Sequence, residues 1–168
     1  GQPHPQRIVS VVPALTEALF VIGAVNQIVG VGSFDAIPSE IAGLPRVGGL
    51  LDPDLEQILS LRPDLVVLYG SQTDQIAQLT RAGIATFSYV HGGLAHSIST
   101  LRRLGDRTGR TNKARRVVST ITSKLARLSM LLGGRRRPRV LLVFGREPGS
   151  LRNIYASGGV GFLHDMLE

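Results

Sequence analysis

Two hydrophobic patterns alternate along the chain and predict alternating strands and helices. Short segments rich in apolar residues, typical of strands, occupy residues 8–12, 27–31, 65–69, 85–90 and 140–144, and the uninterrupted apolar run at 65–68 is typical of a strand buried on both faces. Apolar residues spaced three to four apart, as on one face of a helix, occupy residues 13–22, 53–61, 74–81, 94–109, 111–132 and 161–167. This order predicts an α/β fold with a mostly parallel sheet and flanking helices.

Residues 46–69 (RVGGLLDPDLEQILSLRPDLVVLY) carry the clearest local signals. Asp52 is expected to be a helix N-cap and Pro53 the first helical residue, because both residue types suit those positions. Pro63 prevents the helix from continuing. The apolar run at 65–68 follows and predicts a strand that ends at the ligand-binding edge of a parallel sheet.

Three parts of unequal size follow from this pattern: residues 1–110 form an α/β unit, residues 111–134 a long helix, and residues 135–168 an incomplete second unit. About twenty helical residues give a length of roughly 30 Å. One strand and part of a helix cannot bury their own apolar face. We therefore expect the last part to pack on the first unit, to continue in the natural chain, or to be completed by a partner molecule.

Charge is concentrated in one third of the chain. Residues 101–152 contain thirteen Arg and two Lys against Asp106 and Glu147, whereas residues 1–100 contain four Arg and eight acidic residues. This pattern suits either a solvated Arg-rich helix face or an anionic partner such as nucleic acid or a membrane surface. A nucleic-acid-binding domain that uses residues 102–139 therefore remains an alternative.

Catalytic and metal-binding motifs are not found in the sequence. The 168 residues include no Cys, no Gly-x-Ser-x-Gly, no His-Glu-x-x-His and no Walker-type Gly-Lys-Ser/Thr. His91 and His96 are five residues apart, which does not place them on one helix face. A small α/β enzyme would lack a base–nucleophile pair, so we expect a protein that is not an enzyme and has no cofactor.

Candidate ligand contacts lie where the predicted strands end. Together they form a mixed apolar and polar rim, which suits a bulky planar or globular ligand better than proton transfer. The residues are Pro13, Phe34, Leu50, Tyr69, His91, Phe144 and Arg146.

Three stretches resemble the metal-chelate class of periplasmic binding proteins, the receptors of ABC importers for vitamin B12, ferric siderophores and haem. They are RIVSVVPALTEALFVIGAVNQIVGVG, VGGLLDPDLEQILSLRPDLVVLY and RVLLVFG…YASGGVGFLHDMLE. The resemblance implies two α/β lobes joined by one stiff helix, with the ligand held between the lobes. Here residues 1–110 would be the first lobe, 111–134 the helix between the lobes, and 135–168 the start of the second lobe.

The resemblance also implies residue roles. By position, Phe34, Leu50 and Tyr69 match pocket aromatics of vitamin B12 receptors, although Leu50 and Tyr69 replace Trp. Phe144 matches a pocket position of the second lobe. Glu56 matches a surface Glu that docks onto Arg residues of the permease.

The expected function is therefore capture of a metal chelate, a corrinoid or an iron chelate, and its delivery to an ABC-transporter permease. The expected location is periplasmic or extracytoplasmic. The chain begins with the polar segment GQPHPQ, and a precursor with a lipid anchor is one alternative for this location. Family members continue beyond Glu168, so we expect a truncated receptor whose tail at 139–168 is mobile or paired with another chain, as in a homodimer that completes the second lobe.

Overall fold

The computed structural model describes residues 4–35, 42–136 and 138–167. The chain forms two compact units. The N-terminal unit comprises Gly1–Val90 and Thr100–Val118, and the C-terminal unit comprises His91–Ser99 and Ser119–Glu168. Residues 1–3 and 36–41, Arg137 of the basic segment and Glu168 lie outside the described residues.

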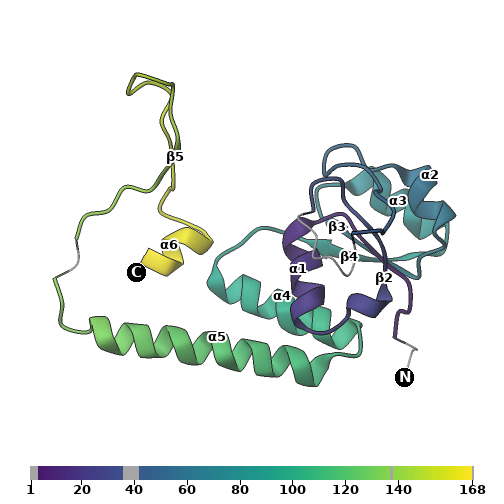
Figure 1. Cartoon of the computed structure of the whole chain (residues 1–168), viewed down its shortest axis with the longest axis horizontal. Coiled ribbons are helices and arrows are strands. Elements are labelled where there is room, and N and C mark those ends of the chain that lie inside the picture. The colour runs from purple at the N-terminus through teal and green to yellow at the C-terminus, as the bar shows by residue number, and fades with distance from the viewer. Residues whose placement is uncertain (1–3, 36–41, 137, 168) are drawn as a thin grey trace. The chain divides into compact units, whose positions relative to one another are not determined.

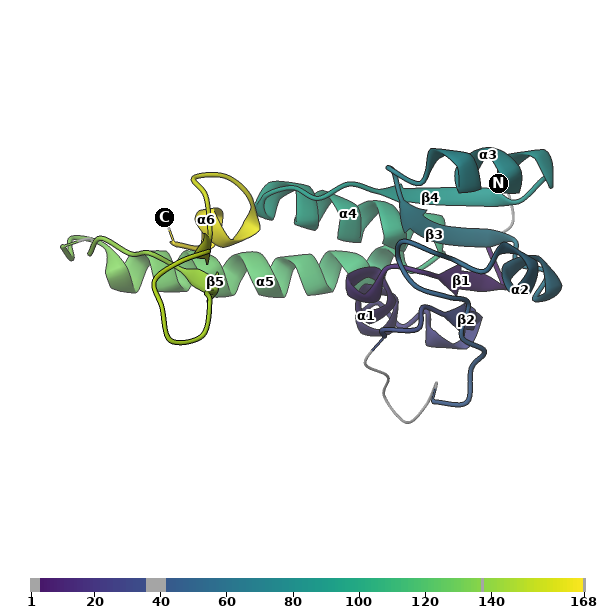
Figure 2. The same cartoon turned by 90° about the horizontal axis from the view of Figure 1, so that it is seen from above.

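A four-stranded parallel sheet organises the N-terminal unit (Figure 2). Its strands, in the spatial order β2-β1-β3-β4, are β2 Ile28–Val31, β1 Ile8–Ser10, β3 Leu65–Tyr69 and β4 Ala85–Tyr89. Ile8 is paired with Leu65, and Val67 with Phe87. Both central strands are buried along almost their whole length, which explains why residues 65–68 of β3 form an uninterrupted apolar run.

Helices cover both faces of this sheet (Figure 1). One face is covered by α1 Pro13–Val21 and by parts of α4 Leu94–Arg107 and α5 Thr111–Leu132. The other face is covered by α2 Leu55–Ser60 and α3 Thr73–Arg81. A short 3₁₀ helix, η1 Val25–Gln27, leads into β2. The predicted α/β class with a mostly parallel sheet and flanking helices is confirmed.

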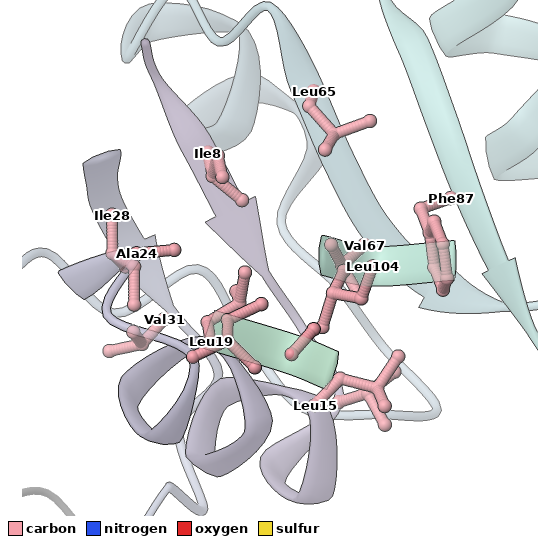
Figure 3. Close-up of a cluster of buried hydrophobic side chains, with 13 residues drawn as sticks. Ile8, Leu15, Leu19, Ala24, Ile28, Val31, Leu65, Val67, Phe87 and Leu104 are labelled. Atoms are coloured by element: carbon pink, nitrogen blue, oxygen red, sulfur yellow. The ribbon is translucent and has the colours of Figure 1, made fainter. Parts of the chain in front are cut away.

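The larger core cluster joins the sheet to α1, α4 and α5 (Figure 3). Leu15 and Leu19 of α1, Leu104 of α4 and Ala114 of α5 pack with the strand residues Ile8, Ile28, Val31, Leu65, Val67 and Phe87. Full burial of one such aliphatic side chain stabilises the fold by about 1.5–3 kcal/mol. The strands are therefore held in a packed core up to the ends from which the loops leave.

The start of α2 differs from the prediction. The N-cap is Asp54, whose Oδ1 accepts a hydrogen bond from the Gln57 backbone at 2.9 Å, and not Asp52. Pro53 lies before the helix, where it forms an isolated antiparallel bridge with Gly48. The Asp52 carbonyl oxygen accepts from the Gly49 backbone, so pairing with the preceding loop holds these two residues out of the helix.

The start of α3 also differs slightly from the helix expected over residues 74–81. The helix begins at Thr73 with Gln72 at the N-cap position, and Asp74 lies in the first turn. Asp74 still places a negative charge at the positive end of the helix dipole. The helix ends at Arg81, and Gly83 has a φ of 75°, which glycine adopts without strain.

The C-terminal unit contains the far part of α5, an antiparallel hairpin and a short helix. The hairpin pairs β5 Val143–Gly145 with β6 Tyr155–Ala156, and α6 is Phe162–Leu167. The sequence predicted a strand at 140–144 and did not predict β6. The Asp165 side chain of α6 accepts a hydrogen bond from the Leu94 backbone, at the start of α4, at 2.6 Å.

Candidate functional site

A hollow of about 330 Å³ lies in the N-terminal unit, where β1, β2 and β3 end. Its walls are almost entirely apolar, and Ser33 and Tyr69 are the lining residues with polar groups in their side chains. The lining residues are Val11, Pro13, Ala14, Gly32, Ser33, Phe34, Leu50 and Tyr69. Because parallel strands end at one edge of a sheet, this edge is the usual ligand site of such folds.

Four of the residues singled out from the sequence meet in this hollow: Pro13, Phe34, Leu50 and Tyr69. The Phe34 side chain is 80 % exposed although it is aromatic. Gly49 leaves room for it, because a Cβ there would lie 3.0 Å from the Phe34 ring. An exposed aromatic ring beside a hollow is a surface available for ligand contact.

Tyr69 is held against a second tyrosine. Its ring and that of Tyr89 are edge-to-face, with centroids 5.4 Å apart and planes at 61°. Burial raises the pKa of the Tyr69 phenol above its usual value, and the neighbouring Tyr89 adds to this rise. The phenol is therefore neutral at physiological pH.

The two loops that carry Phe34 and Leu50 are bound to each other. The Ser33 backbone donates to the Gly48 carbonyl oxygen at 2.8 Å, and Val47 donates to Val31 at 3.0 Å. The Arg46 guanidinium donates to the carbonyl oxygens of Gly32 and Asp35 at 2.9 and 3.2 Å. These contacts fix the backbone on either side of the Phe34 ring.

The Gln72 side chain joins the end of β3 to the loop that carries Leu50. Its Oε1 accepts from the Tyr69 backbone at 2.8 Å, and its Nε2 donates to the Leu50 carbonyl oxygen at 2.9 Å. The side chain is largely buried. Sequence reasoning missed Gln72, because nothing in its local pattern indicates a partner twenty-two residues away.

Asp35 is a second residue that the sequence did not single out. It is buried directly after Phe34, and burial raises the pKa of its carboxyl. Hydrogen bonds from Thr16 and Gly32 and the charge of Arg46 lower that pKa in part. The only sequence signal was an acidic residue inside an otherwise loop-like stretch.

A separate hollow of about 660 Å³ belongs to the C-terminal unit. The predicted contacts His91 and Phe144 line it, together with Gly92, Gly93, Ala156, Ser157, Gly158, Val160, Gly161, Phe162 and Leu163. Arg146 instead donates from its guanidinium to the Ser150 carbonyl oxygen at 2.7 Å, within the hairpin. Glu56 is exposed in the first turn of α2.

The Arg-rich segment forms solvent-exposed helix surface along much of α4 and α5. One of its members has a structural contact, since the Arg103 guanidinium lies 5.1 Å from the centre of the Phe87 ring. Among the described residues, no cluster of three or more His, Cys, Asp or Glu has metal-ligand geometry. The described helices include none that is long and apolar enough to cross a bilayer.

Comparison with known proteins decides the family. The sequence profile described as "Periplasmic binding protein" matches residues 8–168. The chain belongs to this family. The resemblance read from the sequence is thereby confirmed, and its relatives are named as binding proteins and not as enzymes.

Three relatives illustrate the range of the family. A vitamin B12-binding protein of Salmonella typhimurium is 31 % identical over 96 % of this chain, and an uncharacterised ABC transporter substrate-binding lipoprotein of Bacillus subtilis is 27 % identical over 98 %. A solved periplasmic haem-binding protein from Pseudomonas aeruginosa is 27 % identical over 91 % of this chain, with a TM-score of 0.74. The chain spans 59 %, 54 % and 56 % of these proteins. None of these similarities supports the nucleic-acid alternative.

Proposed function

We propose that this chain supplies the first ligand-binding wall of an extracytoplasmic receptor for a metal chelate, which hands its ligand to an ABC-transporter permease. The observation that carries the proposal is the apolar hollow at the strand ends, with Phe34 and Tyr69 on its walls. A corrinoid is our first choice of ligand because of the similarity to a vitamin B12-binding protein. Haem and ferric siderophores are the other members of the class.

Affinity would come from apolar contact with a broad ligand face. The exposed Phe34 ring and the half-buried Tyr69 ring supply that contact. Leu50 also lines the hollow and offers a flexible aliphatic surface. This arrangement grips the organic frame of a chelate and leaves its metal to the chelate's own ligands.

His91, Phe144 and Arg146 are proposed to contact the ligand from the C-terminal unit. His91 and Phe144 line its hollow and combine a polar ring with an aromatic one. Arg146 would suit a carboxylate or an anionic iron complex, since a guanidinium binds such groups with two parallel hydrogen bonds.

Glu56 is proposed to dock onto cationic residues of the permease. It is exposed in the first turn of α2, where its charge also stabilises the helix dipole, and the two roles are compatible. The similarity to a lipoprotein of Bacillus subtilis makes a lipid-anchored precursor our proposal for the envelope location.

The test is a titration with cyanocobalamin, haemin and a ferric siderophore, followed by tyrosine fluorescence and ligand absorbance. We expect saturable binding of at least one of them by the chain, and tighter binding by the product of the complete reading frame. The variant Leu51→Ala is a control that should bind the ligand as the wild type does, because this leucine is 94 % exposed and lies outside the lining of the hollow. Absence of binding for all three ligands in both proteins would overturn the proposal.

A further inference from the structure

Two consecutive glycines, Gly48 and Gly49, precede Leu50 in the loop beside the hollow, and the backbone requires only the first of them. Gly48 has a φ of 84°, which glycine adopts without strain. A Cβ there would lie 2.5 Å from the Asp52 carbonyl oxygen and 2.7 Å from the Asp54 backbone nitrogen. A side chain at position 48 would therefore collide with the backbone that leads into α2, so the fold explains this glycine.

The backbone does not explain Gly49. Its φ is not in the left-handed region, so alanine could adopt the same conformation and would lose less conformational entropy on folding. Apart from its two chain neighbours, the described atoms that a Cβ at Gly49 would meet within 4 Å are Cε2 and Cδ2 of the Phe34 ring, at 3.0 and 3.7 Å. Carbon atoms in van der Waals contact are about 3.5–4.0 Å apart. The open side of Gly49 is therefore the seat of the Phe34 ring.

The backbone on both sides of Phe34 cannot easily give way to such a Cβ. Ser33 donates to the Gly48 carbonyl oxygen at 2.8 Å, which binds the two loops to each other. The Arg46 guanidinium donates to the Gly32 carbonyl oxygen at 2.9 Å. The Phe34 side chain, in contrast, is 80 % exposed and is free to rotate into solvent or over the hollow.

The loop that carries Gly49 is closed on itself as well. The Gly49 backbone donates to the Asp52 carbonyl oxygen at 3.1 Å, and the Asp54 backbone donates to the Val47 carbonyl oxygen at 3.0 Å. With both backbones held, the ring of Phe34 is the part that must move when position 49 acquires a side chain. Phe34 lines the hollow and Gly49 does not, so this movement alters a wall of the hollow.

We propose that Gly49 is a positioning residue of the hollow, which acts through Phe34. Its missing side chain lets the Phe34 ring rest on the loop 47–54, and any side chain at position 49 pushes the ring toward the hollow and narrows the space for a ligand. The placement of the ring stands on the geometry alone, whereas its effect on affinity rests on the proposed function.

The first test needs no ligand. In proton NMR, Phe34→Ala identifies the Phe34 ring signals among those of the five phenylalanines. We expect a nuclear Overhauser effect between the Phe34 ring and the α protons of Gly49, and ring signals that shift in Gly49→Ala and shift further in Gly49→Val. The control Gly145→Ala should leave them in place, because a Cβ there meets nothing within 4 Å among the described residues. A missing Overhauser effect, or ring signals unmoved in both Gly49 variants, would overturn the proposal.

Urea unfolding separates the two glycines. Gly48→Ala should lower the unfolding midpoint, because backbone atoms stand in the way of its methyl group. Gly49→Ala should leave the midpoint unchanged or raise it, since only an exposed ring has to move. An equal loss of stability in the two variants would mean that the backbone yields instead of the ring, and would contradict the proposal.

The last test measures affinity for cyanocobalamin, haemin and a ferric siderophore. For each probe that the wild type binds, we expect the dissociation constant to rise about threefold in Gly49→Ala and about tenfold in Gly49→Val. In a Phe34→Ala background both substitutions should have little effect, because the ring through which they act is gone. Equal losses in the two backgrounds would overturn the positioning role. If all three probes fail to bind the wild type, the proposed function fails, and the NMR experiment alone decides whether Gly49 seats Phe34.

Discussion

Gln72 donates a hydrogen bond from its side-chain amide to the carbonyl oxygen of Leu50 at 2.9 Å. The same side chain accepts from the Tyr69 backbone, so a single buried residue holds two walls of the hollow at a fixed separation. Its loss should therefore affect the stability of the protein and the shape of the hollow together.

Gln72→Leu is expected to lower the free energy of unfolding by about 1–2 kcal/mol, because two backbone groups lose their buried partner. It should also weaken chelate binding. Urea unfolding and the ligand titration measure the two effects. Gln78→Leu, on the exposed face of α3, is the matched control and should change neither quantity.

Phe34→Ala should separate binding from stability. The side chain is 80 % exposed, so its removal should change the free energy of unfolding by less than about 0.5 kcal/mol. Affinity for cyanocobalamin should fall about tenfold, which corresponds to 1.4 kcal/mol, since an aromatic contact surface is lost. Unchanged affinity by fluorescence titration would remove Phe34 from the ligand site.

Asp35→Asn should make the protein more stable at neutral pH. Burial raises the pKa of the folded-state carboxyl above its unfolded value, so the folded state binds the extra proton and stability falls as the pH rises through the folded-state pKa. The amide removes this cost, and the thermal midpoint at pH 7 should rise by about 2 °C or more.

The stability gain of Asp35→Asn should shrink as the pH is lowered, because the wild-type carboxyl becomes neutral as well. Calorimetry at several pH values checks this dependence, with Asp74→Asn as the exposed control. A lower midpoint at pH 7 would contradict the reasoning.

The sequence predicted the bounds of a strand or helix well where contacts within that segment determine them. The strand at 65–69 was predicted to the residue, because Pro63 and four buried apolar residues define it without help from elsewhere. The start of α2 was placed two residues early, since Asp52 and Pro53 pair with the Gly48–Gly49 backbone instead. Good capping residues alone do not reveal such a pairing.

The candidate site shows the same division. The sheet rule placed Pro13, Phe34 and Tyr69 at strand ends, and the structure brings them together with Leu50. Gln72 and Asp35 were missed, because their partners are distant in sequence or lie on another element. Polar residues of this kind become visible only once the chain is folded.

Gly93 and Asp165 form the clearest specific contact of the C-terminal unit. A Cβ at Gly93 would collide with the Asp165 carboxylate, which accepts from the Leu94 backbone at the start of α4. Gly93→Ala should displace this carboxylate and cost about 1 kcal/mol of local stability, as loss of a helix cap does.

Amide hydrogen exchange measures that loss, and we expect faster exchange at the first residues of α4. Gly145→Ala is the control, because a Cβ at Gly145 meets nothing within 4 Å. Asp165→Ala should reproduce the effect of Gly93→Ala. Slow exchange in both variants would show that the contact does not hold the helix start.

Glu56→Lys tests the proposed docking surface. The variant should leave ligand affinity intact and impair transport in cells that carry the permease. Asp74→Lys is matched to it, because both residues lie in the first turn of a helix and each loses a favourable dipole interaction of about 0.3–1 kcal/mol. Equal transport in the two variants, or loss of ligand binding in Glu56→Lys, would argue against this role.

Two of the residues that line the hollow, Phe34 and Leu50, lie outside the packed interior, whereas Val11 and Tyr69 belong to it or pack on it. Phe34 and Leu50 sit on connecting segments, whereas the clusters beneath the sheet consist of other side chains. Exchanging the former for bulkier or smaller groups need not disturb the latter. Substitutions at such positions can therefore change the ligand specificity of this scaffold during evolution without lowering its stability.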